Sequence, residues 1–206
     1  MSERHQCLIY EGSPFLHIEA VAACFTRQLH ENQCCLYINN EAMIEALRIR
    51  LAANGVDVIK ECSKGSLLFS AEKAHLDRRK SFNTERMLCH LEQALEQALQ
   101  DGYTGLFASG DVAWEFGPKK DFAELFEYEW RLERFVRDHP QISGICQYHL
   151  GSLPREALRT GAIVHETIFV DEALSVPNPN YILAKKAAES NVRTGRRLER
   201  GDRFSS

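Results

Sequence analysis

The sequence predicts an α/β fold, a mainly parallel central sheet with helices on both faces, and three observations carry this prediction. Short apolar runs alternate with longer amphipathic stretches, turn residues separate the two kinds of segment, and no internal repeat interrupts the pattern. The 206 residues are 44% hydrophobic and 26% charged, which are ordinary values for a globular domain. A disordered or collagen-like chain is therefore excluded.

Five short apolar runs are bounded by turn residues and are typical of buried strands. A further apolar stretch at 163–170 is long enough for one or two more strands. The five predicted strands are Cys7–Tyr10, Cys34–Ile38, Ser66–Phe69, Gly105–Ala108 and Ile142–Tyr148.

Between these runs, apolar residues recur at the spacing of an amphipathic helix. Asn40 is suited to cap a predicted helix at Glu41–Ala53, and Asn83 is suited to cap the most regular one, Thr84–Gln100. The other predicted helices run from Phe15 to Leu29, from about Asp121 to Arg137, and from Leu153 to Arg159. Strands and helices that alternate in this way predict parallel pairing.

The net charge of −4 averages two unlike regions. Residues 185–203 carry a net charge of +4 and the rest of the chain −8. We expect one domain at 1–182, followed by a basic C-terminal helix or tail at 183–206. The acidic main domain argues against nucleic-acid binding as its principal task.

No apolar run approaches the roughly 18–20 residues that a membrane span requires. The N-terminal segment also lacks the apolar stretch of a signal peptide, so we expect a cytoplasmic protein without a membrane partner. In a reducing cytoplasm, most of the seven cysteines are expected to be small buried hydrophobic residues.

Ligands of open α/β sheets bind beyond the carboxyl ends of the strands. Applied to the predicted strands, this rule places a ligand pocket among six residues. They are Tyr10, Glu11, Asn39, Asp111, Trp114 and Tyr148. Three of them have simpler alternative roles: Asn39 in a turn or helix cap, Asp111 as a helix cap, and Trp114 in packing.

The turn after the first strand is where a nucleotide-binding protein would carry its phosphate loop. Here it reads Glu11-Gly12-Ser13-Pro14-Phe15-Leu16-His17, with one glycine, no lysine and an acidic residue. Neither a Walker A loop nor a dinucleotide-binding fingerprint is present. Ordinary ATP or dinucleotide binding at this turn is therefore not expected.

His5 and Cys7 share one face of the first strand, and Cys146 on another strand could approach them. Together they would supply nitrogen and sulfur ligands for zinc or copper. Cys-x-x-Cys is absent, however, and buried thiols in the core are the alternative.

Nothing in the sequence indicates a nucleophilic enzyme, because it has no Gly-x-Ser-x-Gly turn and no nucleophile with a recognisable histidine partner. His165 is expected to act as a cap, a surface residue or a packing residue. Glu129 and Glu133 lie one turn apart on a helical face that we expect to be solvated.

Three motifs in this order form a specific set: His5-x-Cys7-x-x-Tyr10, Gly110-Asp111-x-x-Trp114 and Cys146-Gln147-Tyr148. Asn178-Pro179-Asn180-Tyr181 closes the pattern. Over roughly residues 5–182 the sequence resembles the MEDS domain, a sensory domain named for methanogens, methylotrophs and the regulator of dichloromethane dehalogenation.

The resemblance implies a RecA/KaiC-like core with a degenerate phosphate loop, in agreement with the missing lysine. It implies a non-catalytic sensory module, with no cofactor, that binds a small hydrocarbon-like molecule. Asp111 would then occupy the place of the acidic residue at the end of the Walker B strand. Family members are usually fused to DNA-binding, kinase or other signalling domains.

The sequence leaves little room for an output domain after Tyr181. We therefore expect the signal to pass in trans to a kinase or transcription regulator, or through the basic tail, and a homodimer is possible. Two alternatives remain open: a residual nucleotide-binding protein, and a metal or redox sensor that uses His5, Cys7 and Cys146.

Overall fold

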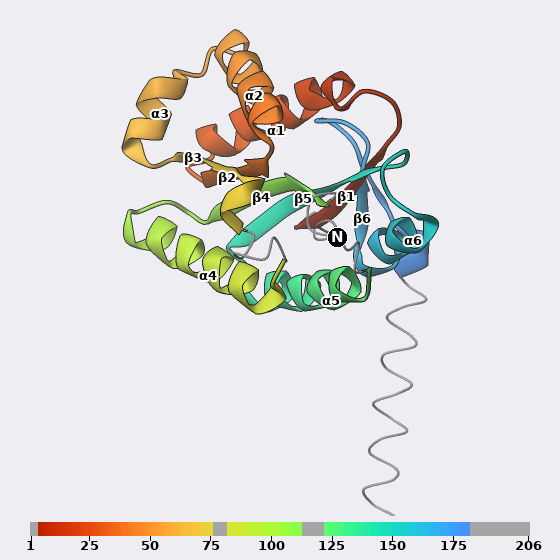
Figure 1. Cartoon of the computed structure of the whole chain (residues 1–206). Coiled ribbons are helices and arrows are strands. Elements are labelled where there is room, and N and C mark those ends of the chain that lie inside the picture. Colours follow the sequence, from red (N-terminus) through yellow and green to blue (C-terminus); the bar gives the residue numbers. More distant parts are fainter. Residues whose placement is uncertain (1–3, 76–81, 113–121, 182–206) are drawn as a thin grey trace, which may run out of the picture.

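The computed structural model describes residues 4–75, 82–112 and 122–181. It contains a seven-stranded sheet in the order β3-β2-β4-β5-β1-β6-β7 (Figure 1). Neighbouring strands pair in parallel except β7, which is antiparallel to β6. The predicted α/β class with a mainly parallel sheet is therefore confirmed.

The strands are short and most are followed by a helix, as a parallel sheet requires. They are β1 (His5–Tyr10), β2 (Cys34–Asn39), β3 (Leu67–Ala71), β4 (Leu106–Asp111), β5 (Ile142–His149), β6 (Thr167–Phe169) and β7 (Ser175–Pro177). The α-helices are α1 (Ile18–His30), α2 (Glu41–Ala53), α3 (Val58–Lys64), α4 (Thr84–Gln100), α5 (Phe122–Asp138) and α6 (Arg155–Val164), with 3-10 helices η1 (Pro14–Leu16) and η2 (Glu72–His75).

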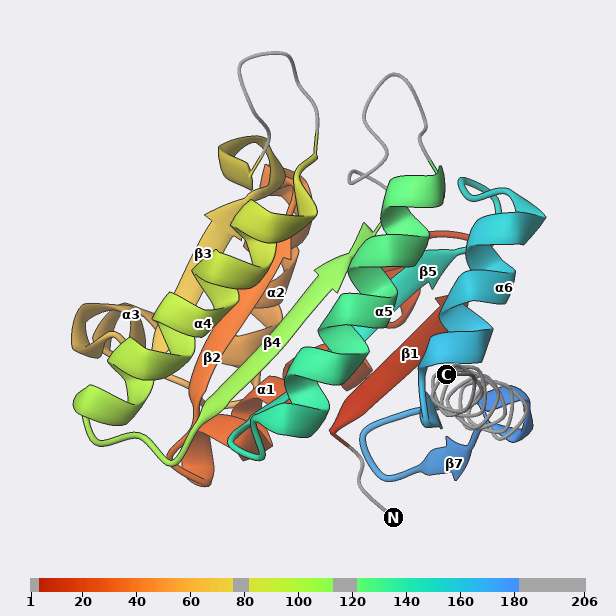
Figure 2. The same cartoon turned by 90° about the horizontal axis from the view of Figure 1, so that it is seen from below.

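Helices cover both faces of the sheet, as the sequence predicts. Figure 1 shows α1, α2 and α3 above the sheet, and Figure 2 shows α4, α5 and α6 side by side across the opposite face. Each face has its own apolar core. Alternate residues of β1 divide between these cores, so that Cys7 joins the α4–α6 side whereas Leu8 and Tyr10 join the α1–α2 side.

The predicted helix caps are confirmed in atomic detail. The Asn40 side chain accepts a hydrogen bond from the Met43 amide at 3.0 Å, and the Asn83 side chain accepts one from the Arg86 amide at 2.8 Å. Each cap satisfies a backbone donor that the first helical turn leaves without a partner. The caps fix where α2 and α4 begin, and therefore how their apolar faces meet the sheet.

A strand, Thr167–Phe169, forms within the apolar stretch at 163–170 as expected. Two features differ from the prediction: the short helix α3 was not expected, and α6 continues through Val164, beyond the predicted end at Arg159. Trp114, the start of the helix near Asp121, and the predicted tail at 183–206 lie outside the described residues.

Cys7, Cys24, Cys34 and Cys35 are buried, in agreement with the expectation that most thiols belong to the core. Among the described helices, none is both long and apolar enough to cross a membrane.

Candidate functional site

Three of the predicted pocket residues lie at the carboxyl edge of the sheet, on the face that α1 and α2 cover. The Tyr10 hydroxyl donates to Asp111 Oδ2 at 2.5 Å. Burial, reinforced by the Asp111 carboxylate, raises the pKa of Tyr10 well above its usual range. Asn39 is only 3% exposed; its amide nitrogen donates to the Tyr37 hydroxyl at 3.0 Å. The polar groups of these residues are thus engaged within the protein.

The other predicted pocket residues do not join this group. Glu11 is exposed on the turn after β1. Tyr148 is fully buried in the core on the α4–α6 side. The sheet itself separates Tyr148 from Tyr10 and Asn39, because neighbouring residues of a strand point to opposite faces.

The turn after β1 does not suit a nucleotide phosphate. A phosphate site of this kind uses backbone amides at a helix N-terminus and a lysine. Here Ser13 caps a three-residue 3-10 helix through the Phe15 amide, and α1 begins only at Ile18. The exposed Glu11 carboxylate would also repel a phosphate. The structure therefore offers no fit for the nucleotide of ATP-binding RecA-like proteins at this turn.

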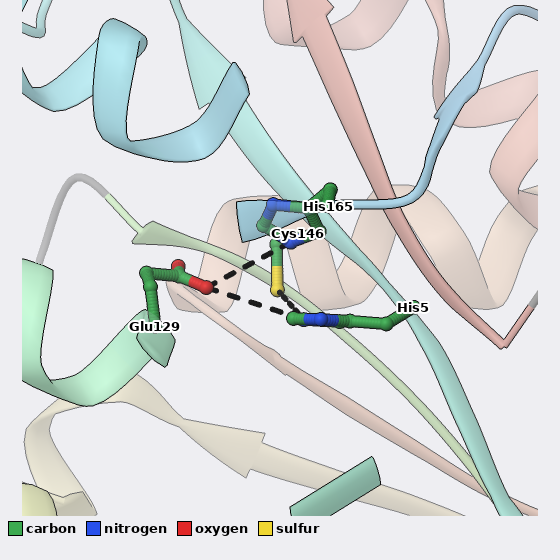
Figure 3. Close-up of side chains that lie close together, drawn as sticks. All are labelled: His5, Glu129, Cys146 and His165. Atoms are coloured by element: carbon green, nitrogen blue, oxygen red, sulfur yellow. Dashed lines mark hydrogen bonds and ion pairs between the residues drawn. The ribbon is translucent and has the colours of Figure 1, made fainter. Parts of the chain in front are cut away.

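A different group of side chains converges beneath α5 and α6. His5, Glu129, Cys146 and His165 place one ligand atom each within 4.8 Å of the others (Figure 3). The Cys146 sulfur lies 3.5 Å from His5 Nε2. Glu129 Oε2 lies 3.7 Å from His165 Nε2 and 4.0 Å from His5 Nε2. We call these four residues the buried cluster.

The buried cluster draws on four elements of the fold. His5 begins β1, Cys146 lies within β5, Glu129 lies within α5 and His165 follows the last residue of α6. The parallel pairing of β1 with β5 brings His5 and Cys146 onto the same face of adjacent strands. The helices α5 and α6 pack together and place Glu129 and His165 over that face.

Three expectations for these residues need revision. Glu129 is fully buried, so the helical face that carries it is not solvated; Glu133 is mostly buried as well. His165 is the C-cap of α6, as one of the expected roles has it, but its imidazole also belongs to the cluster. Cys7 lies outside the cluster, buried in the adjacent core.

Burial sets the ionisation of these groups. It lowers the pKa of His5 to about 3 and that of His165 well below its usual value, so both imidazoles are neutral at physiological pH. Burial also raises the pKa of Glu129 to about 7. The pKa of the Cys7 thiol rises to about 12 for the same reason.

A second set of residues holds the cluster in place. The Glu133 carboxylate receives hydrogen bonds on its two oxygens: His5 Nδ1 lies 2.8 Å from Oε2, and the Tyr181 hydroxyl donates to Oε1 at 2.7 Å. Asn178, 1% exposed, donates to the backbone carbonyl of His165 at 2.8 Å. The Asn178–Tyr181 segment therefore supports two members of the cluster.

An apolar cavity of about 50 Å³ borders the cluster, between the sheet and helices α4 and α5. Its walls include Met87 and Leu91 of α4 together with Leu132 of α5. His5 and Cys146 belong to its lining as well as to the cluster. The cavity and the polar group are thus neighbours on one face of the sheet.

The comparisons with known proteins agree with this architecture. The family model described as MEDS, MEthanogen/methylotroph, DcmR Sensory domain, matches residues 4–166. The chain belongs to the MEDS family. The matched region of this MEDS domain contains all four residues of the buried cluster, and membership of a sensory family indicates a role in sensory signalling.

No curated protein matches this MEDS chain. Among solved structures, the KaiC-like protein of the hyperthermophilic archaeon Pyrococcus horikoshii OT3 is similar, with a TM-score of 0.56 and 12% identity over 81% of this chain and 69% of that chain. At this identity the likeness establishes a RecA/KaiC-like fold and nothing about activity.

Glu129 and the role of His165 were not predicted, because the candidate metal ligands were sought only on the predicted strands. One signal was available. The buried apolar positions Leu125, Leu132 and Val136 form a helical stripe on α5, and Glu129 falls inside it. A carboxylate within an apolar stripe indicates a buried partner.

Proposed function

We propose that this chain is a non-catalytic sensory domain that binds a small, mainly apolar molecule in the cavity between the sheet and helices α4 and α5. The observation that carries the proposal is the cavity itself, which lies inside a sensory-family domain and has predominantly aliphatic walls. Apolar walls with a few placed polar groups are the usual character of a small-molecule site.

The size of the cavity limits the ligand. A cavity of about 150 Å³ holds benzene, whereas this one has about 50 Å³. A molecule of roughly one to three heavy atoms therefore fits without rearrangement. Ala108 on β4 and Met87 on α4 would contact it from opposite walls. This ligand class is the hydrocarbon-like one expected from the sequence.

The proposed pocket shares only Asp111, the last residue of β4, with the sequence-based set, and it lies on the opposite face of the sheet from Tyr10. Tyr10 remains part of the proposal through its hydrogen bond to Asp111. Asn39 lies on the other face of the sheet and Glu11 is exposed on the turn after β1, so neither lines this cavity. A sensory domain needs an output, and we propose a kinase or transcription regulator as the protein that receives the signal.

Filling the cavity tests this proposal. Ala108→Val adds two methyl groups to the wall of the cavity while retaining a residue with high strand propensity. We expect isothermal titration with one- to three-carbon alcohols and halocarbons to give saturable binding to the native protein. The Ala108→Val variant should bind at least tenfold more weakly, because its valine occupies the ligand's space.

Ala94→Val is the matched control. Ala94 of α4 is partly buried against the same core but does not line the cavity, so binding should be retained. Equal binding by both variants, or no saturable binding by the native protein to any probe, would contradict the proposal.

A further inference from the structure

We propose that His5, Glu129, Cys146 and His165 form a binding site for a divalent transition-metal ion of the zinc class. The site adjoins the apolar cavity described above and shares His5 and Cys146 with its lining, but a metal ion there needs no ligand in the cavity. Two imidazoles, one thiolate and one carboxylate are a donor set that tetrahedral Zn²⁺ readily accepts.

The separations between ligand atoms agree with a tetrahedral ion. At ordinary bond lengths, two nitrogen or oxygen ligands of zinc lie about 3.3 Å apart, and a nitrogen and a sulfur ligand about 3.6 Å apart. The His5 nitrogen and the Cys146 sulfur are separated by 3.5 Å. The separations of 3.7 and 4.0 Å that involve Glu129 need only a small inward movement.

The positions of the protons favour a cation at this point. His165 Nδ1 lies 2.8 Å from the Gly161 carbonyl oxygen, which can only accept, so Nδ1 carries the proton and Nε2 presents a lone pair. His5 Nδ1 faces the Glu133 carboxylate, which likewise leaves a lone pair on His5 Nε2. His165 Nε2 lies 3.7 Å and His5 Nε2 lies 4.0 Å from Glu129 Oε2, and His5 Nε2 also lies 3.5 Å from the Cys146 sulfur.

Two members of the cluster, Glu129 and His165, are poorly satisfied in the absence of a cation. Neither oxygen of Glu129 nor His165 Nε2 has a hydrogen bond of normal geometry among the described residues, although all three atoms are buried. The Tyr148 hydroxyl and the Cys146 thiol lie near enough to lower the pKa of Glu129 in part. A buried polar atom without a partner is costly, and one bound cation would serve all three.

The surroundings match the second layer of known metal sites. A ligating histidine usually gives its other ring nitrogen to a carboxylate or a backbone carbonyl, which fixes the tautomer and the ring orientation. His5 has the carboxylate of Glu133 and His165 has the carbonyl of Gly161. The Tyr181 hydroxyl in turn holds Glu133.

Cobalt substitution gives a direct readout on the full chain. The metal-free protein, prepared with a chelator and reductant, is titrated with Co²⁺ and then with Zn²⁺. We expect one ion per chain, a thiolate-to-cobalt charge-transfer band, and intense visible bands typical of tetrahedral cobalt. The Cys146 thiol releases its proton to solvent as the sulfur–metal bond forms.

Variants assign the ligands. Cys146→Ser should abolish the charge-transfer band, and His165→Gln should weaken Co²⁺ binding by at least 100-fold. Glu133→Gln, which alters a positioning residue, should weaken it by about 10- to 100-fold and leave the band in place. Cys7→Ala and the exposed Cys89→Ser are matched controls that should retain both the band and the affinity.

X-ray absorption of the zinc-loaded native protein keeps the test independent of whether a variant folds. The expected first shell contains one sulfur at about 2.3 Å and three nitrogen or oxygen atoms at about 2.0 Å. Binding weaker than millimolar, a first shell without sulfur, or an unchanged cobalt spectrum in Cys146→Ser would overturn the proposal. Failure of alcohol or halocarbon binding would leave these results unaffected and would bear only on the proposed function.

Discussion

At the scale of single residues, side chains at the carboxyl edge of the sheet are held by hydrogen bonds and ring contacts with one another. Tyr10 bonds to Asp111, and its ring lies against two imidazoles, with centroid separations of 3.8 Å to His17 and 5.0 Å to His149. His149 in turn lies 2.9 Å from the Gly12 carbonyl oxygen. These contacts hold the turn after β1 in place without a phosphate.

His17 makes this edge sensitive to acid. Burial, followed by the proximity of His149, lowers the pKa of His17 from 6.5 to about 4. Between these two values the unfolded chain binds more protons than the folded protein. The contribution of neutral His17 to the free energy of unfolding is therefore fully present above pH 6.5 and is lost as the pH falls through about 4. We expect His17→Gln to reduce this acid loss by on the order of 1 kcal/mol, allowing for partial solvent exposure.

Urea unfolding of the native protein and of His17→Gln at pH 7.5 and pH 5 measures the difference. His30→Gln is the control, because His30 is exposed at the end of α1, and its pH dependence should match that of the native protein. If the free energy of unfolding changes by the same amount between the two pH values in all three proteins, His17 does not contribute to the acid sensitivity.

At the scale of secondary structure, the close approach of β4 and β5 depends on one small residue. A Cβ atom at Gly144 would lie 2.2 Å from the Ala108 carbonyl oxygen, far inside contact distance. The obstacle is backbone and cannot rotate away. We expect Gly144→Ala to destabilise the protein by about 3 kcal/mol or more, because the two strands must separate locally. Thermal unfolding measures this change.

Gly151→Ala is the control for this prediction. Gly151 is exposed, and a Cβ there would meet only the His149 side chain at 3.0 Å, which can move. Its effect should stay below about 1 kcal/mol. If Gly144→Ala unfolds at the temperature of the native protein, the β4–β5 contact is looser than described.

The elements differ in how far the sequence predicted them, and the reasons are physical. The helix α4 combines the Asn83 cap with a regular apolar face, so local and tertiary preferences agree. The helix α3 has no buried residue, and only the Asp57 cap and the left-handed Gly65 mark its ends. Without an apolar face, a seven-residue helix leaves almost no periodic signal.

The candidate site was predicted only in part, for a related reason. His5 and Cys7 share one face of a strand because side chains alternate along it, and Cys146 was expected to approach them from another strand. Glu129 and His165 join the buried cluster only because α5 and α6 pack over that face. Which helix covers which strand is a tertiary fact that one sequence does not specify. Tyr148 is a second example. Its side chain lies on the opposite face of the sheet from Tyr10, because the two residues occupy alternate positions on their paired strands.

At the scale of the whole molecule, the sheet divides the domain into two unlike halves. The α1–α2 half is a packed core, whereas the α4–α6 half contains the cavity and the buried cluster side by side. A ligand in the cavity would touch the inner faces of α4 and α5. Movement of these helices against the sheet would then carry the signal toward a partner.

The methionines report on each half in a single spectrum. Met87 lines the cavity, and Met43 is buried in the opposite core. In protein labelled with ¹³C at the methionine methyl groups, we titrate xenon, which binds small apolar cavities. We expect a saturable shift of the Met87 methyl signal with the Met43 signal unchanged. Equal shifts of the two signals, or a shift of Met43 alone, would contradict the placement of the sensory site.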